Sequence, residues 1–213
     1  MSQGVREQNK NARYKSIVST AERLFLENGL DSVQMQDVAD AGEIGIATLF
    51  RYFPKKDRLI VAVAIQSLER TLPVFERIAK SPKTAYERLD DVLNYLLENQ
   101  TLEKKHSSKF REAFESYASI RKEPLTGIHA YIELQEQITQ TLLPIIEDGK
   151  VDGSIRTDIP IKKALITIIN TYGTFGNNVV LKAPISYTDA DIEPHIQQHM
   201  LKEILLSYVR PIK

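Results

Sequence analysis

Apolar residues recur at three- and four-residue spacing along most of this chain, and no run of segments alternates apolar and polar residues as half-buried strands would. The pattern predicts an all-α protein. Its first predicted helix starts at Tyr14, carries Ile17, Ala21 and Phe25 on one face, and stops at Gly29, because glycine readily ends a helix.

Two short helices of about two turns each are predicted next, over residues 34–41 and 46–53, with Pro54 stopping the second. The tight turn between them is Gly42-Glu43-Ile44-Gly45. Two such helices after a longer supporting helix are typical of a helix-turn-helix domain, whose last helix enters the major groove of DNA.

The rest of the chain predicts longer helices. One begins at residues 55–57 and reaches Pro73, which is expected to kink or end it. Further helices are predicted at 83–100, 105–119, 124–148, 161–181 and 189–208. Gly149 and Gly153 are interpreted as a helix-ending and a turn glycine. We predict two domains: a helix-turn-helix DNA-binding domain at 1–58, and a helical ligand-binding and dimerisation domain at 59–213.

Charge changes this picture through its placement. The chain has 28 Lys+Arg and 28 Asp+Glu, so its net charge does not indicate a nucleic-acid partner. However, residues 1–15 carry Arg6, Lys10, Arg13 and Lys15 against one acidic residue, and residues 51–58 carry four basic residues against one. A single basic cluster is usually a solvated face. Two clusters that flank a candidate DNA-reading helix make an ordinary solvated face the less favoured interpretation.

The segment from Arg13 to Leu59 resembles the TetR family of bacterial regulators. Its most specific part is residues 48–59, TLFRYFPKKDRL, an aromatic-rich reading helix followed by a lysine at the start of the next helix. The resemblance implies that Lys56 holds a phosphate. Leu49 and Phe53 are expected to be core residues rather than contacts, and Phe50 and Tyr52 could each be either. The resemblance and the outer face of the reading helix together predict the residues that contact DNA. These are Gln36, Ile46, Ala47, Thr48, Phe50, Arg51, Tyr52 and Lys56.

Three positions depart from the family pattern. Gln34 stands where a Ser or Thr cap is common, although Asp37 can still help to cap the helix. Glu43 stands where the turn usually has glycine, so either the turn shifts or Glu43 adopts a left-handed conformation. Ile46 replaces a commonly polar residue, which favours contact with a thymine methyl group.

Beyond residue 60 the resemblance covers only length, helix content and helix order. It implies that the last two helices pair across a two-fold axis, with an interface of Phe175, Val179, Ile196, Met200 and Ile204. These apolar bands could instead form intramolecular core. The aromatic residues Tyr95, Phe114, Tyr117 and Tyr172 are predicted to line a ligand cavity; for each one alone, an ordinary core or surface role is favoured.

Several other chemistries lack support. The chain has no cysteine, which excludes disulfides and thiolate chemistry. His195, His199 and Glu203 have a spacing that can bind a metal, but a solvent-exposed helix face is favoured. No nucleophile motif is present, so we expect neither an enzyme nor a cofactor. A polar N-terminus and the lack of a long apolar run predict a cytoplasmic protein without a membrane partner.

The sequence therefore predicts a homodimeric transcriptional repressor that leaves a palindromic duplex operator when an unknown small-molecule effector binds. Two alternatives stay open. One is a DNA-binding regulator that is controlled by a protein partner or acts as an activator. The other is a helical ligand-binding or catalytic protein with a vestigial helix-turn-helix.

Overall fold

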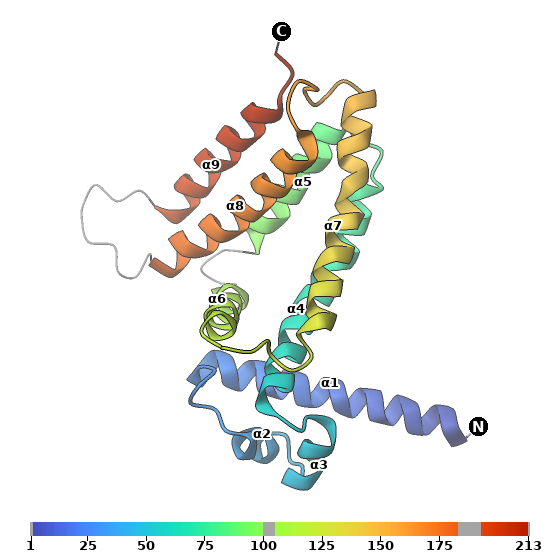
Figure 1. Cartoon of the computed structure of the whole chain (residues 1–213), viewed down its shortest axis with the longest axis vertical. Coiled ribbons are helices and arrows are strands. Elements are labelled where there is room, and N and C mark those ends of the chain that lie inside the picture. Colours follow the sequence, from blue (N-terminus) through green and yellow to red (C-terminus); the bar gives the residue numbers. More distant parts are fainter. Residues whose placement is uncertain (1, 100–104, 183–192, 213) are drawn as a thin grey trace. The chain divides into compact units, whose positions relative to one another are not determined.

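The computed structural model describes residues 2–99, 105–182 and 193–212, and within these ranges the chain forms helices and no strand (Figure 1). This confirms the predicted all-α fold class. The helices are α1 (Ser2–Asn28), α2 (Met35–Ala41), α3 (Ile46–Tyr52), α4 (Lys56–Ala79), α5 (Ala85–Glu98), α6 (Lys105–Ser119), α7 (Ile128–Val151), α8 (Ile161–Lys182) and α9 (Pro194–Val209).

The described residues fall into two compact units. The first comprises those within Met1–Glu69 and Phe110–Leu134, and the second those within Arg70–Lys109 and Gln135–Lys213. By packing, the first unit thus extends beyond the helix-turn-helix and includes most of α6 and the start of α7. The division of roles predicted between residues 58 and 59 remains a prediction.

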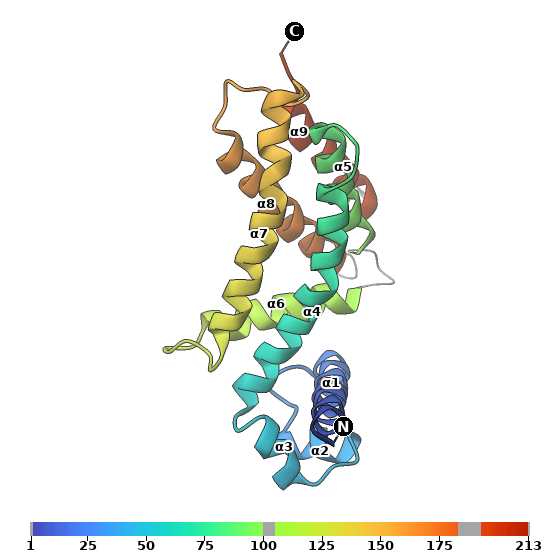
Figure 2. The same ribbon diagram turned by 90° about the vertical axis from the view of Figure 1, so that its right-hand side faces the viewer.

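The first unit has a continuous apolar core to which α1, α2, α3 and α4 all contribute. In both views α2 and α3 lie on the same side of α1 (Figures 1 and 2). Burial of large aliphatic and aromatic side chains between these helices supplies most of the stabilisation of such a small bundle. Its most deeply buried members include Val18, Ala21, Val38, Ala39, Leu49, Leu59, Ile60 and Val63.

In the second unit α8 and α9 lie side by side, and α5 packs on both (Figure 1). Polar contacts fix the rotation of α9 about its own axis. The buried Lys202 ammonium donates to the Asn94 side-chain oxygen at 2.6 Å and pairs with the Asp90 carboxylate at 2.7 Å. The buried Gln198 amide donates to the Gly176 carbonyl at 3.1 Å. The residues of α9 on the other side of the helix are thereby turned outward.

Helix positions agree closely with the predictions, with three differences. α1 begins at Ser2 rather than Tyr14, because its polar N-terminal half carries no apolar stripe that would reveal it. Pro73 does not end α4, which continues to Ala79 and buries Phe75 beyond the proline; the kink that the sequence also allowed stays a prediction. Residues 189–192 of the last predicted helix lie outside the described residues.

The third difference concerns Gly149, whose interpretation as a helix-ending glycine is wrong. It lies inside α7, which runs on to Val151. A Cβ atom there would stand 2.8 Å from the Ile155 Cδ1 atom, so glycine is required for the close approach of this side chain. Gly153, with a φ angle of +68°, is a turn glycine as predicted.

Candidate nucleic-acid interface

The start of α2 is capped in a way that compensates for the unusual residue before it, Gln34. Gln34 has an extended backbone, and its N–H donates to the Asp37 carboxylate at 2.7 Å. A carboxylate three residues into a helix satisfies a free backbone donor and lies at the positive end of the helix dipole. The expectation that Asp37 helps to cap this helix is therefore confirmed.

The turn between α2 and α3 contains the strained residue that the sequence allowed for. Glu43 has a φ angle of +50°, whereas Gly42 has a φ angle of −89°. The left-handed conformation of Glu43 lets the Ile44 N–H reach back to the Ala39 carbonyl at 3.0 Å. This bond directs the chain into α3. Of the two outcomes predicted for this turn, Glu43 takes the left-handed one.

α3 separates its residues into an inner and an outer face. Leu49 is fully buried, and Phe53, directly after the helix, is almost so, as predicted for core residues. On the outer face the Phe50 ring is 45% exposed, and Ala47 and Arg51 are exposed as well. A helix of seven residues anchored by its inner face can present this outer face to the major groove.

The remaining predicted contact residues are less exposed or already have a partner. Ile46, Thr48 and Tyr52 are half-buried, and Ile46 and Tyr52 pack against the core of the first unit. Gln36 is exposed on α2, where its amide donates to the Asp40 carboxylate at 2.7 Å. Their contacts with DNA stay predictions.

Lys56 is the first residue of α4, and its side chain is hydrogen-bonded to the loop before α2. Its ammonium donates to the Asp31 carbonyl at 3.1 Å. Burial lowers the pKa of this ammonium; the negative charge of Asp31 opposes the shift, and the positive charge of Arg121 adds to it. The side chain is thus positioned before any phosphate arrives.

A contact that sequence reasoning missed lies next to Lys56. The Tyr117 hydroxyl donates to the Asp57 carboxylate at 2.9 Å, and the Arg121 guanidinium stacks over the Tyr117 ring at 4.1 Å from its centroid. Burial and the bond to Asp57 raise the pKa of the Tyr117 phenol. Because these residues are far apart in the chain, spacing could not reveal that α6 contacts the start of α4.

The four aromatic residues predicted to line a ligand cavity are divided between the two units. Phe114 and Tyr117 are buried in the core of the first unit, while Tyr172 is buried in the core of the second and Tyr95 packs against it. The Tyr172 hydroxyl is buried without a hydrogen-bond partner among the described residues. A buried hydroxyl left in this state is costly, unless a bound molecule satisfies it.

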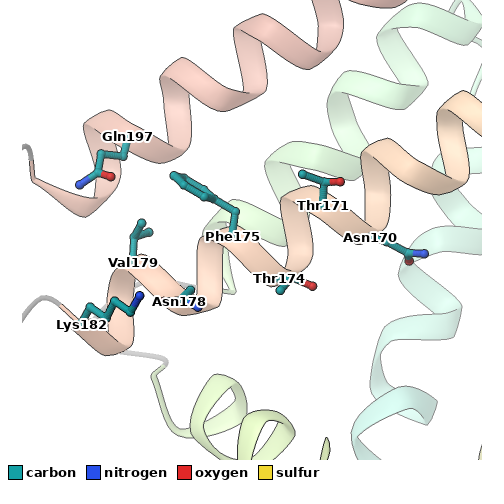
Figure 3. Close-up of a pocket in the computed structure, with 8 residues that line it drawn as sticks. All are labelled: Asn170, Thr171, Thr174, Phe175, Asn178, Val179, Lys182 and Gln197. Atoms are coloured by element: carbon teal, nitrogen blue, oxygen red, sulfur yellow. The ribbon is translucent and has the colours of Figure 1, made fainter.

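The five residues predicted for a dimer interface lie on α8 and α9. Ile196, Met200 and Ile204 are 43%, 54% and 61% exposed and recur every four residues along α9. Phe175 and Val179 of α8 are half-buried and face a groove of about 760 Å³ that also includes Gln197 of α9 (Figure 3). Large apolar side chains on one exposed face are uncommon in a monomer, so this face is a candidate contact surface.

In the part of the chain that the structure describes, no group of three or more His, Cys, Asp or Glu residues is arranged to hold a metal ion. Among these same residues, no helix is both long enough and apolar enough to cross a bilayer.

Comparison with known proteins agrees with this geometry. Residues 17–63 match the family described as bacterial regulatory proteins, tetR family. The chain is 32% identical over 84 residues to the HTH-type transcriptional repressor KstR of Mycolicibacterium smegmatis, a match that covers 39% of this chain and 41% of that repressor. The chain thus matches about two fifths of the length of this curated relative.

Solved structures resemble the chain over nearly its whole length. FadR of Bacillus subtilis in complex with stearoyl-CoA superposes with a TM-score of 0.70 at 17% identity, covering 92% of this chain and all of that one. A regulator of Saccharomonospora viridis in complex with choline gives a TM-score of 0.73 at 15% identity, covering 95% of this chain and 100% of that one. At these identities the likeness shows the fold.

Proposed function

Because the chain belongs to the tetR family of bacterial regulatory proteins, whose pattern it carries at residues 17–63, we propose that it is a homodimeric, sequence-specific repressor of transcription. The observation that carries the proposal is the division of α3 into two faces. Leu49 and Phe53 fix the helix in the core, while Phe50, Ala47 and Arg51 stand outward. A rigid helix with an outward face is what reading of base edges requires.

In this proposal α3 lies in the major groove. Phe50 and Ile46 contact thymine methyl groups, Thr48 and Gln36 make hydrogen bonds to base edges or phosphates, and Arg51, Tyr52 and Lys56 contact the backbone, with Ala47 allowing close approach. Lys56 is the best-positioned phosphate ligand, because its bond to the Asp31 carbonyl leaves further N–H groups of the same ammonium available.

Two copies would pair through α8 and α9. Supporting this, α9 is held by Lys202 and Gln198 on its inner side, and it carries Ile196, Met200 and Ile204 on its outer side. A two-fold axis brings the same patch of both copies together, which would cover these side chains and the groove at Phe175 and Val179. A dimer of this kind holds two reading helices at a fixed separation.

A small, largely apolar effector would release the operator. Within the second unit, Tyr95 and Tyr172 offer apolar surface with polar ends, and the Tyr172 hydroxyl, which has no hydrogen-bond partner among the described residues, offers a hydrogen bond to such a molecule. Phe114 and Tyr117 lie in the core of the first unit and are not part of this proposed site. By linkage, an effector that weakens operator binding must itself bind the DNA-bound dimer more weakly by the same factor; a coupling of ~1–3 kcal/mol changes affinity about 5- to 150-fold. Thermal-shift screening of hydrophobic and cationic compounds, followed by operator competition, tests this step.

The DNA-binding proposal is tested by selection of bound fragments from a pool of random duplexes. We expect one palindromic site whose half-sites are separated by about one helical turn of DNA or a multiple of it. Phe50→Ala should reduce enrichment of this site. Ile132→Ala, which truncates a different exposed apolar side chain of the first unit, should leave enrichment unchanged. Failure of the wild-type chain to enrich any duplex would refute the proposed function.

A further inference from the structure

The N-terminal half of α1 contributes no side chain to the buried core of its own unit, and its Tyr14 packs on that unit while remaining 40% exposed. Every described side chain from Gly4 to Ser16 is exposed, and burial begins only at Ile17 and Val18. Figure 1 shows this half projecting beyond α3 and the start of α4. We refer to Gly4–Ser16 as the arm. Because helical segments of this length are marginal in water with little tertiary packing, the arm would gain stability from a partner.

The basic residues of the arm gather on one face. Arg6, Lys10 and Arg13 are separated by four and three residues, so their side chains form a stripe along the helix. Ile17, four residues after Arg13, continues the same line and is buried in the core. The stripe therefore prolongs the face by which α1 packs on its domain. Lys15 lies off this line and points elsewhere.

A ring contact connects the arm to the residue that follows α3. The Tyr14 ring packs on the Phe53 ring at 5.1 Å between centroids, directly after α3. Burial and the negative charge of Glu69 raise the pKa of the Tyr14 phenol, and the positive charge of Arg58 opposes this shift. Tyr14 thus ties the end of the arm to the residue that directly follows α3, and α2 and α3 lie on one side of α1 (Figure 2).

We propose that Arg6, Lys10 and Arg13 bind the phosphates of the DNA strand that flanks the half-site read by α3. This inference rests on the proposed function and extends its contact surface. From Arg6 to Arg13 the helix rises about 10 Å. Phosphates of one strand follow each other every 3.4 Å or so of the duplex axis, so the stripe matches about three such steps, the span from a first to a fourth phosphate.

The composition of the arm favours DNA over a lipid surface. Val5 is its only large aliphatic side chain, whereas a helix that lies in a membrane interface needs a continuous apolar face opposite its basic one. The other described residues of the arm are mostly polar amides and charges. Such a surface gains little by burial, but it can exchange solvated cations for phosphate contacts.

The test compares the triple variant Arg6→Gln, Lys10→Gln, Arg13→Gln with the wild-type chain on the duplex recovered by selection. The slope of the logarithm of the binding constant against the logarithm of salt concentration should become shallower by about 0.9 for each phosphate that the variant no longer binds. Arg13→Gln should reproduce part of this change. Its matched control, Lys15→Gln, removes the same charge two positions away and should leave the slope almost unchanged.

Trimming the duplex separates a local contact from a general loss of charge. Removal of the base pairs outside the half-sites should weaken binding of the wild-type chain and leave binding of the triple variant unaffected. If the wild-type chain binds the selected duplex but trimming weakens both proteins equally, or the triple variant keeps the wild-type slope, the arm does not bind DNA although the proposed function stands. If the wild-type chain selects no duplex, both proposals fail.

Discussion

The hydroxyl of Tyr117 donates a 2.9 Å hydrogen bond to the carboxylate of Asp57, which joins α6 to the first turn of α4. The bond lies within the first unit, one residue from Lys56. It therefore supports the helix end that we expect to meet a phosphate. Removal of the hydroxyl should lower stability without changing the charge of the protein at neutral pH.

Tyr117→Phe should lower the free energy of unfolding by about 1 kcal/mol at neutral pH, the usual contribution of one hydrogen bond. The pKa of Tyr117 is raised above its ordinary value of 10.0 by burial and by the bond to Asp57. A phenol with a raised pKa stabilises the folded state below the unfolded pKa, and this contribution is lost as pH rises through the folded pKa. The difference between wild type and variant in urea unfolding should thus shrink above pH 10; a difference that grows would contradict the bond.

Lys56→Ala should weaken binding to selected and unrelated duplexes about equally, because a phosphate contact reads no base. The salt dependence should become shallower by about 0.9 for each phosphate that is no longer bound. Titrations at several salt concentrations measure both effects. Lys150→Ala, which removes an exposed lysine of the second unit, is the control. An unchanged slope for Lys56→Ala would remove this residue from the phosphate contacts.

Phe175→Asp combined with Val179→Asp should produce monomers, because a two-fold interface would bury the new charges from both copies. Sedimentation velocity measures the oligomeric state, and circular dichroism checks that the helices persist. Val151→Asp, at an 88% exposed position off the α8–α9 face, should remain dimeric. A folded double variant that sediments as a dimer would place the interface elsewhere.

Glu43→Gly should raise stability slightly. A side chain in the left-handed region costs about 1–2 kcal/mol, whereas glycine there costs only its larger entropy loss of about 0.5–1 kcal/mol relative to alanine. Glu43→Ala keeps a Cβ atom and should give no such gain. Thermal unfolding of the three proteins compares them, and equal midpoints for Gly and Ala would mean that the turn is not strained.

The structural features that could be predicted from the sequence depend on short-range patterns. Leu49 and Phe53 could be assigned to the core because the 3.6-residue period and Pro54 define α3 locally. The conformation of Glu43 was one of two outcomes implied by a missing glycine. The contact of Tyr117 with Asp57 and the separation of Phe114 from Tyr172 depend on how distant helices pack, which periodicity does not encode. The full length of α1 was missed because its polar half buries nothing.

The central claim is that α3 reads a specific sequence, and one equilibrium measurement tests it most directly. The affinity of the wild-type chain is compared between the selected duplex and a scrambled duplex of equal length and composition, at one physiological salt concentration. We predict that the selected duplex binds at least about 10³-fold more tightly, the lower end for specific DNA-binding proteins, and that Phe50→Ala reduces this ratio. A ratio close to one for the wild-type chain would contradict the claim.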